Sequence, residues 1–128
     1  MVNRESIKTF VRQTLGCGCP EEVFNYIDCQ SDVVLKDILL SRKINIGNRL
    51  LIYVIEVSTP DSVKHILPLL VETGRRERES MRFNRFRLVL AADSLNEIKQ
   101  AADAVFETVK KDERVHLHII PKADIPIF

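Results

Sequence analysis

The chain has 128 residues, of which 45% are hydrophobic and 29% are charged, values typical of one globular domain spanning residues 1–128. Nineteen basic residues nearly balance eighteen acidic ones, so the formal net charge of +1 gives no general sign of a nucleic-acid or membrane partner. The N-terminus lacks the apolar stretch of a secretory signal and no apolar run could span a bilayer, so we expect a cytoplasmic protein without a membrane partner.

The N-terminal part of the chain predicts two helices. Ile7, Phe10 and Val11 recur at helical spacing, and Gly16 stands where a glycine commonly ends a helix. Pro20 then fits the first position of a second helix, because its missing N–H group has no partner there. We therefore expect a short helix to follow Pro20.

From about residue 33 the apolar period changes from 3.6 to 2. Apolar and polar residues alternate over 33–46, as in a half-buried strand. Residues 46–49 contain a Gly-Asn pair, which is a turn signal between strands. Residues 50–55 are apolar on both faces and predict a central strand.

Two helix-strand units follow this hairpin. Thr59-Pro60-Asp61 predicts a helix start, Gly74 its end, and Pro68 a kink or a restart within it. A strand is expected over 86–92. Ser94 with Glu97 has the spacing of a capping box, and the helix behind it leads to a last strand over 115–120.

These elements predict an α/β fold, or α+β sandwich, in which two N-terminal helices precede a β-β-α-β-α-β order. The strands would form a four-stranded mixed sheet with the helices packed on it. Right-handed crossovers place both later helices on one face if the strands follow one direction across the sheet, or on opposite faces if the strand order reverses. The N-terminal helices would then cover the remaining face.

The most distinctive motif is Cys17-Gly18-Cys19-Pro20. Two thiolates one residue apart can share a soft metal such as zinc or iron, or cycle between dithiol and disulfide. Cys29 is a third candidate ligand. His116 and His118 lie two apart on a predicted strand, so both would project from one face, and one of them could complete a tetrahedral site.

The alternative is that the three cysteines are small apolar residues without chemistry. Three is an odd number, which argues against a disulfide framework, and free cysteine is often buried. Two glycines around Cys17 make that loop a poor place to bury thiols. Glu21 and Glu22 would oppose a free thiolate, so they favour a bound cation.

A second candidate site is the basic stretch 74–87, in which six arginines and two glutamates give a local charge of +4. Guanidinium groups and aromatic rings suit contacts with phosphates and bases. The alternative is a solvated connector that leads into a strand. The candidate residues for nucleic-acid or anion binding are Arg75, Arg76, Arg78, Arg82 and Arg85.

Two weaker patterns concern the hairpin. Asp37 followed by Glu56-Val57-Ser58 is similar to the acidic residues of restriction-endonuclease-like sites, but those sites carry a lysine where this chain has Ser58. We interpret that match as chance. The exposed edge of the hairpin could also pair with a second copy or a protein partner, which predicts a homo-oligomer or a complex subunit.

The segment Thr14–Phe24, TLGCGCPEEVF, resembles the opening of a group of short bacterial and archaeal proteins of unknown function. The resemblance implies a prokaryotic cytosolic protein and transfers no catalytic residue. We therefore predict a small protein that uses its Cys-Gly-Cys turn for metal binding or thiol redox chemistry. The alternative is a non-catalytic binding module that uses the arginines of 75–87 on a nucleic acid or a protein. Whether a reaction is catalysed is left open at this stage.

Overall fold

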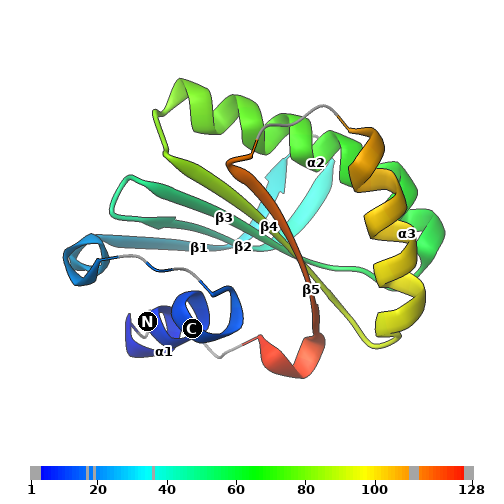
Figure 1. Cartoon of the computed structure of the whole chain (residues 1–128), viewed down its shortest axis with the longest axis horizontal. Helices are drawn as coiled ribbons and strands as arrows, with labels where there is room; N and C mark the ends of the chain where they lie inside the picture. The colour runs from blue at the N-terminus through cyan, green and yellow to red at the C-terminus, as the bar shows by residue number, and fades with distance from the viewer. Residues whose placement is uncertain (1–3, 17, 19, 36, 110–112, 126–128) are drawn as a thin grey trace.

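The structure is a computed structural model that describes residues 4–16, 18, 20–35, 37–109 and 113–125. Its centre is one five-stranded mixed sheet in the order β1-β2-β3-β4-β5 (Figure 1). The first three strands are antiparallel neighbours, whereas β3, β4 and β5 run parallel. The strands span Ile27–Leu35 (β1), Ile38–Ile46 (β2), Leu50–Glu56 (β3), Arg85–Ala92 (β4) and Val115–Pro121 (β5).

Helical segments cover both faces of this sheet. The crossover helices α2 and α3 pack on one face, which is the first of the two arrangements that the sequence left open, and the N-terminal segment packs on the other (Figure 1). The helical segments are α1 (Arg4–Thr9), η1 (Phe10–Thr14, a π-helix), η2 (Glu21–Asn25, a 3-10 helix), α2 (Pro60–Ser80), α3 (Leu95–Thr108) and η3 (Lys122–Asp124, a 3-10 turn). The sheet therefore separates two apolar clusters.

The middle of the sheet is buried from both sides, which explains why β3 has no polar alternation. Leu51 and Tyr53 belong to the cluster under α2 and α3, whereas Ile52 and Val54 belong to the cluster under the N-terminal segment. In β4 the even-numbered residues from Phe86 onward face the crossover helices. The odd-numbered residues, which include Arg87, therefore face the N-terminal segment.

The hydroxyl group of Tyr53 is the polar end of a buried side chain in the core under α2 and α3, and it has a hydrogen-bond partner. The Tyr53 hydroxyl donates a hydrogen bond to Oε1 of Glu77 on α2, and Lys43 forms an ion pair with Oε2 of the same carboxylate. Burial, together with that hydrogen bond, raises the pKa of Tyr53 well above its usual range. This network stabilises the contact between α2 and the sheet.

The predicted number of four strands is wrong, because the stretch 33–46, predicted as one strand, contains the end of β1 and the whole of β2, and β1 is a fifth strand at the edge of the sheet. Its sequence, IDCQSDVVL, is polar in the middle and has weak strand propensity. The strand forms because it pairs with β2 from Ile27 opposite Ile46 to Leu35 opposite Ile38. Asp37 closes the hairpin with a φ of 66°, so the turn forms without glycine.

The prediction of two N-terminal α-helices is also wrong in detail. The first helix continues from α1 into a π-helix, and Gly16 then turns the chain with a φ of 68°. The second segment is only the short 3-10 helix η2, because β1 begins at Ile27, two residues after η2 ends. The Gly47 N–H donates a 2.7 Å hydrogen bond to the Tyr26 carbonyl and so fixes this junction against the β2–β3 turn.

The turn predicted between residues 46 and 49 is confirmed. Gly47 and Asn48 have φ values of 60° and 55°, which suit the two central positions of a tight hairpin turn. A Cβ atom at position 47 would lie 2.5 Å from the Val23 carbonyl oxygen. Glycine is therefore required at this position both by the backbone conformation and by the close approach of η2.

Helix α2 is longer than the sequence predicted. Thr59 caps it by accepting a hydrogen bond from the Ser62 N–H at 3.2 Å, and the helix runs through Pro68 and Gly74 to Ser80. Gly74 does not end the helix, because its role is to let the Phe86 ring of β4 approach the backbone. The expected capping box at Ser94 is wrong as well, since the Ser94 side chain makes no capping hydrogen bond.

Replacing Gly74 with alanine should lower the free energy of unfolding, because overpacking a core usually costs about 1–3 kcal/mol. A methyl group at position 74 would lie 2.1 Å from Cζ of the buried Phe86 ring. This clash should exceed the gain of about 1 kcal/mol that alanine has over glycine within a helix. Urea unfolding of both proteins measures the difference.

Gly18→Ala is the matched control, because nothing lies within 4 Å of a Cβ atom built there. It should change the free energy of unfolding by less than about 0.5 kcal/mol. Gly74→Ala should cost less in a Phe86→Leu background, where the ring is gone. An equal cost in both backgrounds would contradict the explanation.

Candidate functional site: a basic pocket at the amino ends of the parallel strands

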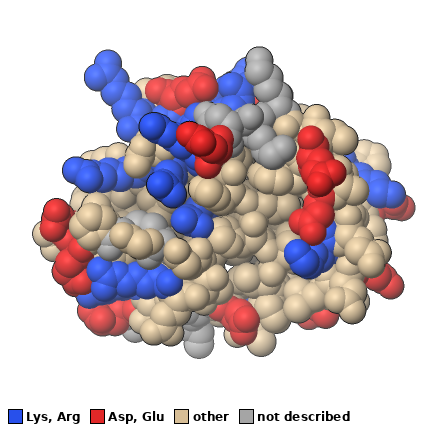
Figure 2. Space-filling model, in the orientation of Figure 1, with Lys and Arg blue, Asp and Glu red and all other residues tan. Residues whose placement is uncertain are grey.

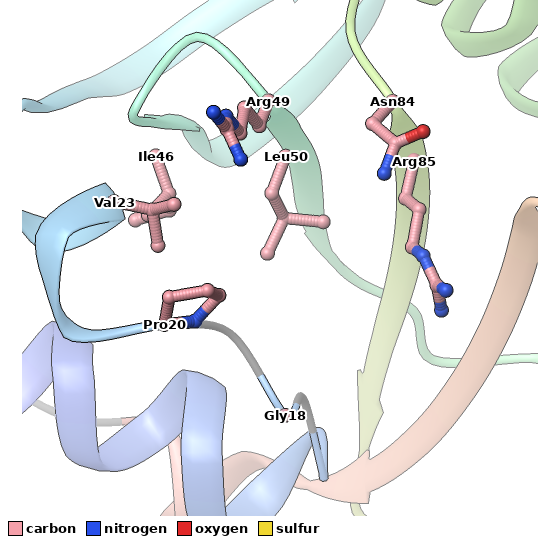
Figure 3. A pocket seen from close by; sticks show the side chains of 8 residues that line it. All are labelled: Gly18, Pro20, Val23, Ile46, Arg49, Leu50, Asn84 and Arg85. Carbon is pink, nitrogen blue, oxygen red and sulfur yellow. The ribbon is translucent and has the colours of Figure 1, made fainter.

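A pocket of about 240 Å³ opens beside the amino ends of β3 and β4, which we call the amino-edge pocket. Figure 3 shows that Gly18, Pro20 and Val23 of the N-terminal segment border one side of it, opposite the residues of the sheet. The residues that line it are Gly18, Pro20, Val23, Ile46, Arg49, Leu50, Asn84 and Arg85.

The backbone holds the two sheet segments of this pocket together. The Arg49 carbonyl accepts hydrogen bonds from the N–H groups of Asn84 at 2.7 Å and of Arg85 at 3.1 Å. Arg49 follows the β2–β3 turn, and Arg85 begins β4. These bonds bring two arginines that are far apart in the sequence to the same end of the sheet.

The charge of the amino-edge pocket is positive and uncompensated among the described residues. Arg49 and Arg85 are both exposed, and the described residues that line the pocket include no Asp or Glu. Oδ1 of Asn84 accepts a 3.2 Å hydrogen bond from Arg114, so its NH₂ group remains as a donor on the pocket side (Figure 3). The polar side chains of this lining therefore offer hydrogen-bond donors to a ligand.

The surrounding surface has the same character. Most Lys and Arg side chains on the face seen in Figure 2 lie over its left half, interspersed with a few acidic groups. In Figure 1 this part of the molecule holds the end of α2 and the starts of β4 and β5. The start of β4, where Arg85 lines the pocket, lies in this more basic part of the view.

A buried arginine, Arg87, lies two residues after Arg85 on the same face of β4. Arg87 is 6% exposed and donates hydrogen bonds to the Leu15 carbonyl at 3.0 Å and to His118 at 2.8 Å. Leu15 precedes the Cys-Gly-Cys loop, and His118 lies on β5. The guanidinium group of Arg87, which is on β4, therefore connects the N-terminal segment with β5.

Both histidines of β5 are held in the neutral form by this environment. Burial, and then the charge of Arg87, lowers the pKa of His118 to about 4. Burial and the charges of Arg87 and Arg85 also lower the pKa of His116. Because His118 accepts the hydrogen bond from Arg87, its Nε2 atom carries no proton.

The predicted thiol site is divided among different parts of the chain. Cys17 and Cys19 lie outside the described residues. Cys29 lies half-buried on β1, and burial raises the pKa of its thiol. His116 and His118 lie on β5 at the opposite edge of the sheet.

Four strand spacings separate β1 from β5, or about 19 Å at 4.8 Å per spacing. One metal ion therefore cannot contact both Cys29 and a histidine of β5. Among the residues that the structure describes, no group of three or more His, Cys, Asp or Glu side chains could hold a metal ion. The role of Cys17 and Cys19 stays a prediction from the sequence.

The predicted arginine site is dispersed over several elements. On α2, Arg75 pairs with Glu79 at 3.3 Å and Arg76 with Glu72 at 2.7 Å, while Arg78 is buried. Arg82 lies in the turn after α2, where it has a φ of 61°. Of the five predicted residues, only Arg85 lines the amino-edge pocket.

Arg49 and Asn84 were not predicted as site residues from the sequence, and no site role was predicted for Arg87. The alternation of Arg85 and Arg87 at the start of a buried strand was a usable signal, because it places two cations on one face. Arg49 gave no such signal. Its role depends on the contact between the β2–β3 turn and the start of β4.

A second group of charged residues lies toward the carboxyl end of β3. Asp32, Arg42, Glu56 and Lys122 line a pocket there, and Lys122 also pairs with Asp93 at 3.4 Å. Two acids and two bases balance each other among these lining residues. Asp37 of the nuclease-like pattern is not among them, and Arg42 lies on β2 between the strands that carry Asp32 and Glu56.

The predicted oligomer would form through the edge of the sheet at β1. β1 is an edge strand, and Val34 and Leu39, which pair across the hairpin, are 64% and 56% exposed. Pairing with a second copy along this edge stays a prediction.

Comparisons with protein-family models, curated proteins and solved structures gave no match. The resemblance of residues 14–24 to a group of short prokaryotic proteins therefore stays a prediction. Among the described helices, none combines the length and the apolar character that a bilayer span needs.

The stability of the protein should depend on pH through His118. The pKa of His118 is about 4 in the folded protein, below the ordinary value of 6.5, so between these values the unfolded chain binds the proton more strongly. The free energy of unfolding should therefore fall as the pH is lowered from about 6.5 to about 4. Urea unfolding across this range measures the slope.

His118→Gln keeps an acceptor for Arg87 but cannot take up the proton, so its slope should be flatter than that of the wild type. His65→Gln, at an exposed position of α2, is the matched control and should keep the wild-type slope. Parallel profiles for wild type and His118→Gln would contradict this expectation.

If Cys17 and Cys19 bind a metal or form a redox pair, Cys17→Ser and Cys19→Ser should each abolish that property without unfolding the domain. Inductively coupled plasma mass spectrometry on protein purified without chelator and without oxygen measures zinc and iron. Cys29→Ser serves as the control, because Cys29 packs against an apolar cluster. Equal metal content and equal redox behaviour in all variants would contradict the prediction.

Proposed function

We propose that this protein binds phosphate-bearing ligands at the amino-edge pocket. The observation that carries the proposal is the convergence of Arg49, Arg85 and the Asn84 amide on a pocket whose described lining includes no carboxylate. Arginines in such surroundings are available to an anion from solution. The sequence predicted, as its alternative, a binding module that uses the arginines of 75–87. The present proposal keeps that function but assigns it to Arg85, the one of the predicted arginines that lines a pocket.

Phosphate suits this set of donors. The planar guanidinium group presents a fork of N–H donors that matches two phosphate oxygens, and such charge-assisted hydrogen bonds are shorter and stronger than neutral ones. The Asn84 amide adds a neutral donor. Three donor groups around one pocket can therefore satisfy several phosphate oxygens at once.

The size of the pocket limits what enters it. Its volume of about 240 Å³ is below the ~300–1,000 Å³ that is usual for a pocket that encloses a drug-sized ligand. It suits a phosphate group and its nearest substituent, with the remainder of the ligand lying on the basic surface around it. A nucleotide or a nucleic-acid backbone meets this description.

The positive charge also bears on the metal-binding prediction. The guanidinium groups of Arg49 and Arg85 carry positive charge, so they repel a metal cation at the pocket. Gly18 and Pro20, the neighbours of Cys19, line the same pocket. Anion binding there and metal binding by the adjacent turn are thus competing proposals, and we favour anion binding.

The test is a titration with inorganic phosphate followed by NMR, together with binding of a labelled single-stranded oligonucleotide at several salt concentrations. Amide signals of Gly18, Leu50 and Arg85 should shift with phosphate. The double variant Arg49→Gln, Arg85→Gln should weaken the binding of both ligands by about 100-fold, because two lost charged hydrogen bonds of about 1.5 kcal/mol each amount to about 3 kcal/mol. Oligonucleotide affinity should fall steeply with salt through counterion release.

Arg76→Gln is the matched control, because Arg76 is an exposed arginine on α2 that pairs with Glu72 and lies outside the pocket. It should leave phosphate affinity within about twofold of the wild type. Equal weakening by Arg76→Gln and by the double variant would show general charge attraction and overturn the proposal, as would the absence of phosphate-induced shifts at low salt.

A further inference from the structure

Arg87 is a buried cation whose hydrogen-bond partners are neutral. Its two hydrogen bonds end on the Leu15 carbonyl and on His118, whose pKa is too low for a positive charge at neutral pH. Among the described residues, no acid contributes to the electrostatics of Arg87, and the charged group that acts on it is Arg85. A buried charge without a counterion is costly, so this position favours an anion.

Two buried nitrogen atoms beside this charge have no hydrogen-bond partner among the described residues. They are Nε of Arg87 and Nε2 of His116. Arg87 and His116 are direct partners in the parallel β4–β5 pairing, and both project from the face that packs against the N-terminal segment. Buried polar atoms are normally paired, so two unpaired nitrogens on neighbouring strands indicate a missing partner with acceptor atoms.

These nitrogens lie further along the strands from the amino-edge pocket, beyond the residues that line it. Arg85, which lines that pocket, precedes Arg87 by two residues on the same face of β4. Two residues along a strand correspond to about 6.6 Å. The charge of Arg85 lowers the pKa of both Arg87 and His116, as expected for groups this close.

We propose that Arg87 and His116 form a second anion subsite beyond the amino-edge pocket, and that the ligand carries two adjacent phosphate groups, as a diphosphate does. One phosphate would contact Arg49, Asn84 and Arg85. The other would accept hydrogen bonds from Nε of Arg87 and from Nε2 of His116 in its N–H tautomer. This inference rests on the proposed function and adds to it the class of the ligand.

The test compares inorganic phosphate with inorganic pyrophosphate by isothermal titration calorimetry. The wild-type protein should bind pyrophosphate about tenfold more tightly than phosphate, a difference of about 1.4 kcal/mol. His116→Gln should reduce this preference to about threefold or less and leave phosphate affinity nearly unchanged. His116 is only partly buried, so this variant is expected to fold. Arg87→Gln is a second variant, used if its circular dichroism spectrum matches that of the wild type.

His65→Gln is the matched control, because it makes the same substitution at an exposed position of α2. It should keep the full preference for pyrophosphate. Any cationic surface attracts pyrophosphate more than phosphate, so the decisive result is the loss of preference in His116→Gln alone. An unchanged preference in His116→Gln, or no preference in the wild type, would overturn the second subsite.

The outcomes separate this inference from the proposed function. If phosphate binds and depends on Arg49 and Arg85 but pyrophosphate has no advantage, only the second subsite fails. If neither ligand binds, the proposed function fails as well. Where pyrophosphate has the advantage, a nucleoside diphosphate and a short single-stranded oligonucleotide test the source of the two phosphates. Tighter binding of the nucleoside diphosphate than of pyrophosphate supports the two-subsite arrangement, whereas tighter binding of the oligonucleotide than of either diphosphate would overturn the choice of a diphosphate as the ligand.

Discussion

The hydrogen bond from Arg87 to the Leu15 carbonyl is the contact on which the site depends. It crosses from the middle of the sheet to the N-terminal segment, over a sequence separation of 72 residues. The same guanidinium group also binds His118 on β5. A charged donor holds a carbonyl more strongly than a neutral donor does, so this contact fixes the position of the chain just before the Cys-Gly-Cys turn. Gly18 and Pro20, which follow Leu15 closely in the chain, line one side of the amino-edge pocket.

The two ends of the parallel strands differ in charge, and this difference decides where a ligand is expected. In most open α/β sheets ligands bind at the carboxyl ends of the strands. Here the acids and bases that line the pocket on that side, Asp32, Glu56, Arg42 and Lys122, balance each other. The amino ends keep a positive charge, because the turn before β3 and the start of β4 each bring an arginine and the described lining includes no acid. Electrostatics therefore favours the less usual end of this sheet.

Much of the fold could be predicted because its strongest signals are local. The central strands, both crossover helices and the Gly47-Asn48 turn have sequence patterns that the final structure preserves. Two of the errors arise because a contact with another segment overrides a local preference. β1 forms by pairing with β2 despite a polar sequence, and Gly74 lies within α2 because the Phe86 ring packs against it. Pairing and packing of this kind cannot be read from one segment alone.

The sequence by itself determined the α/β class, the order of the crossover units and the common face of His116 and His118, since all three depend on residue periodicity along the chain. Only the tertiary structure decided which charges act together. It separated Cys29 from the histidines by the width of the sheet and dispersed the arginine stretch over a helix, a turn and a strand. It also brought Arg49 beside Arg85, because neighbouring parallel strands align their starts while the sequence separates them by a whole helix. A site built from the ends of several elements therefore depends on strand order, which no single segment of the sequence encodes.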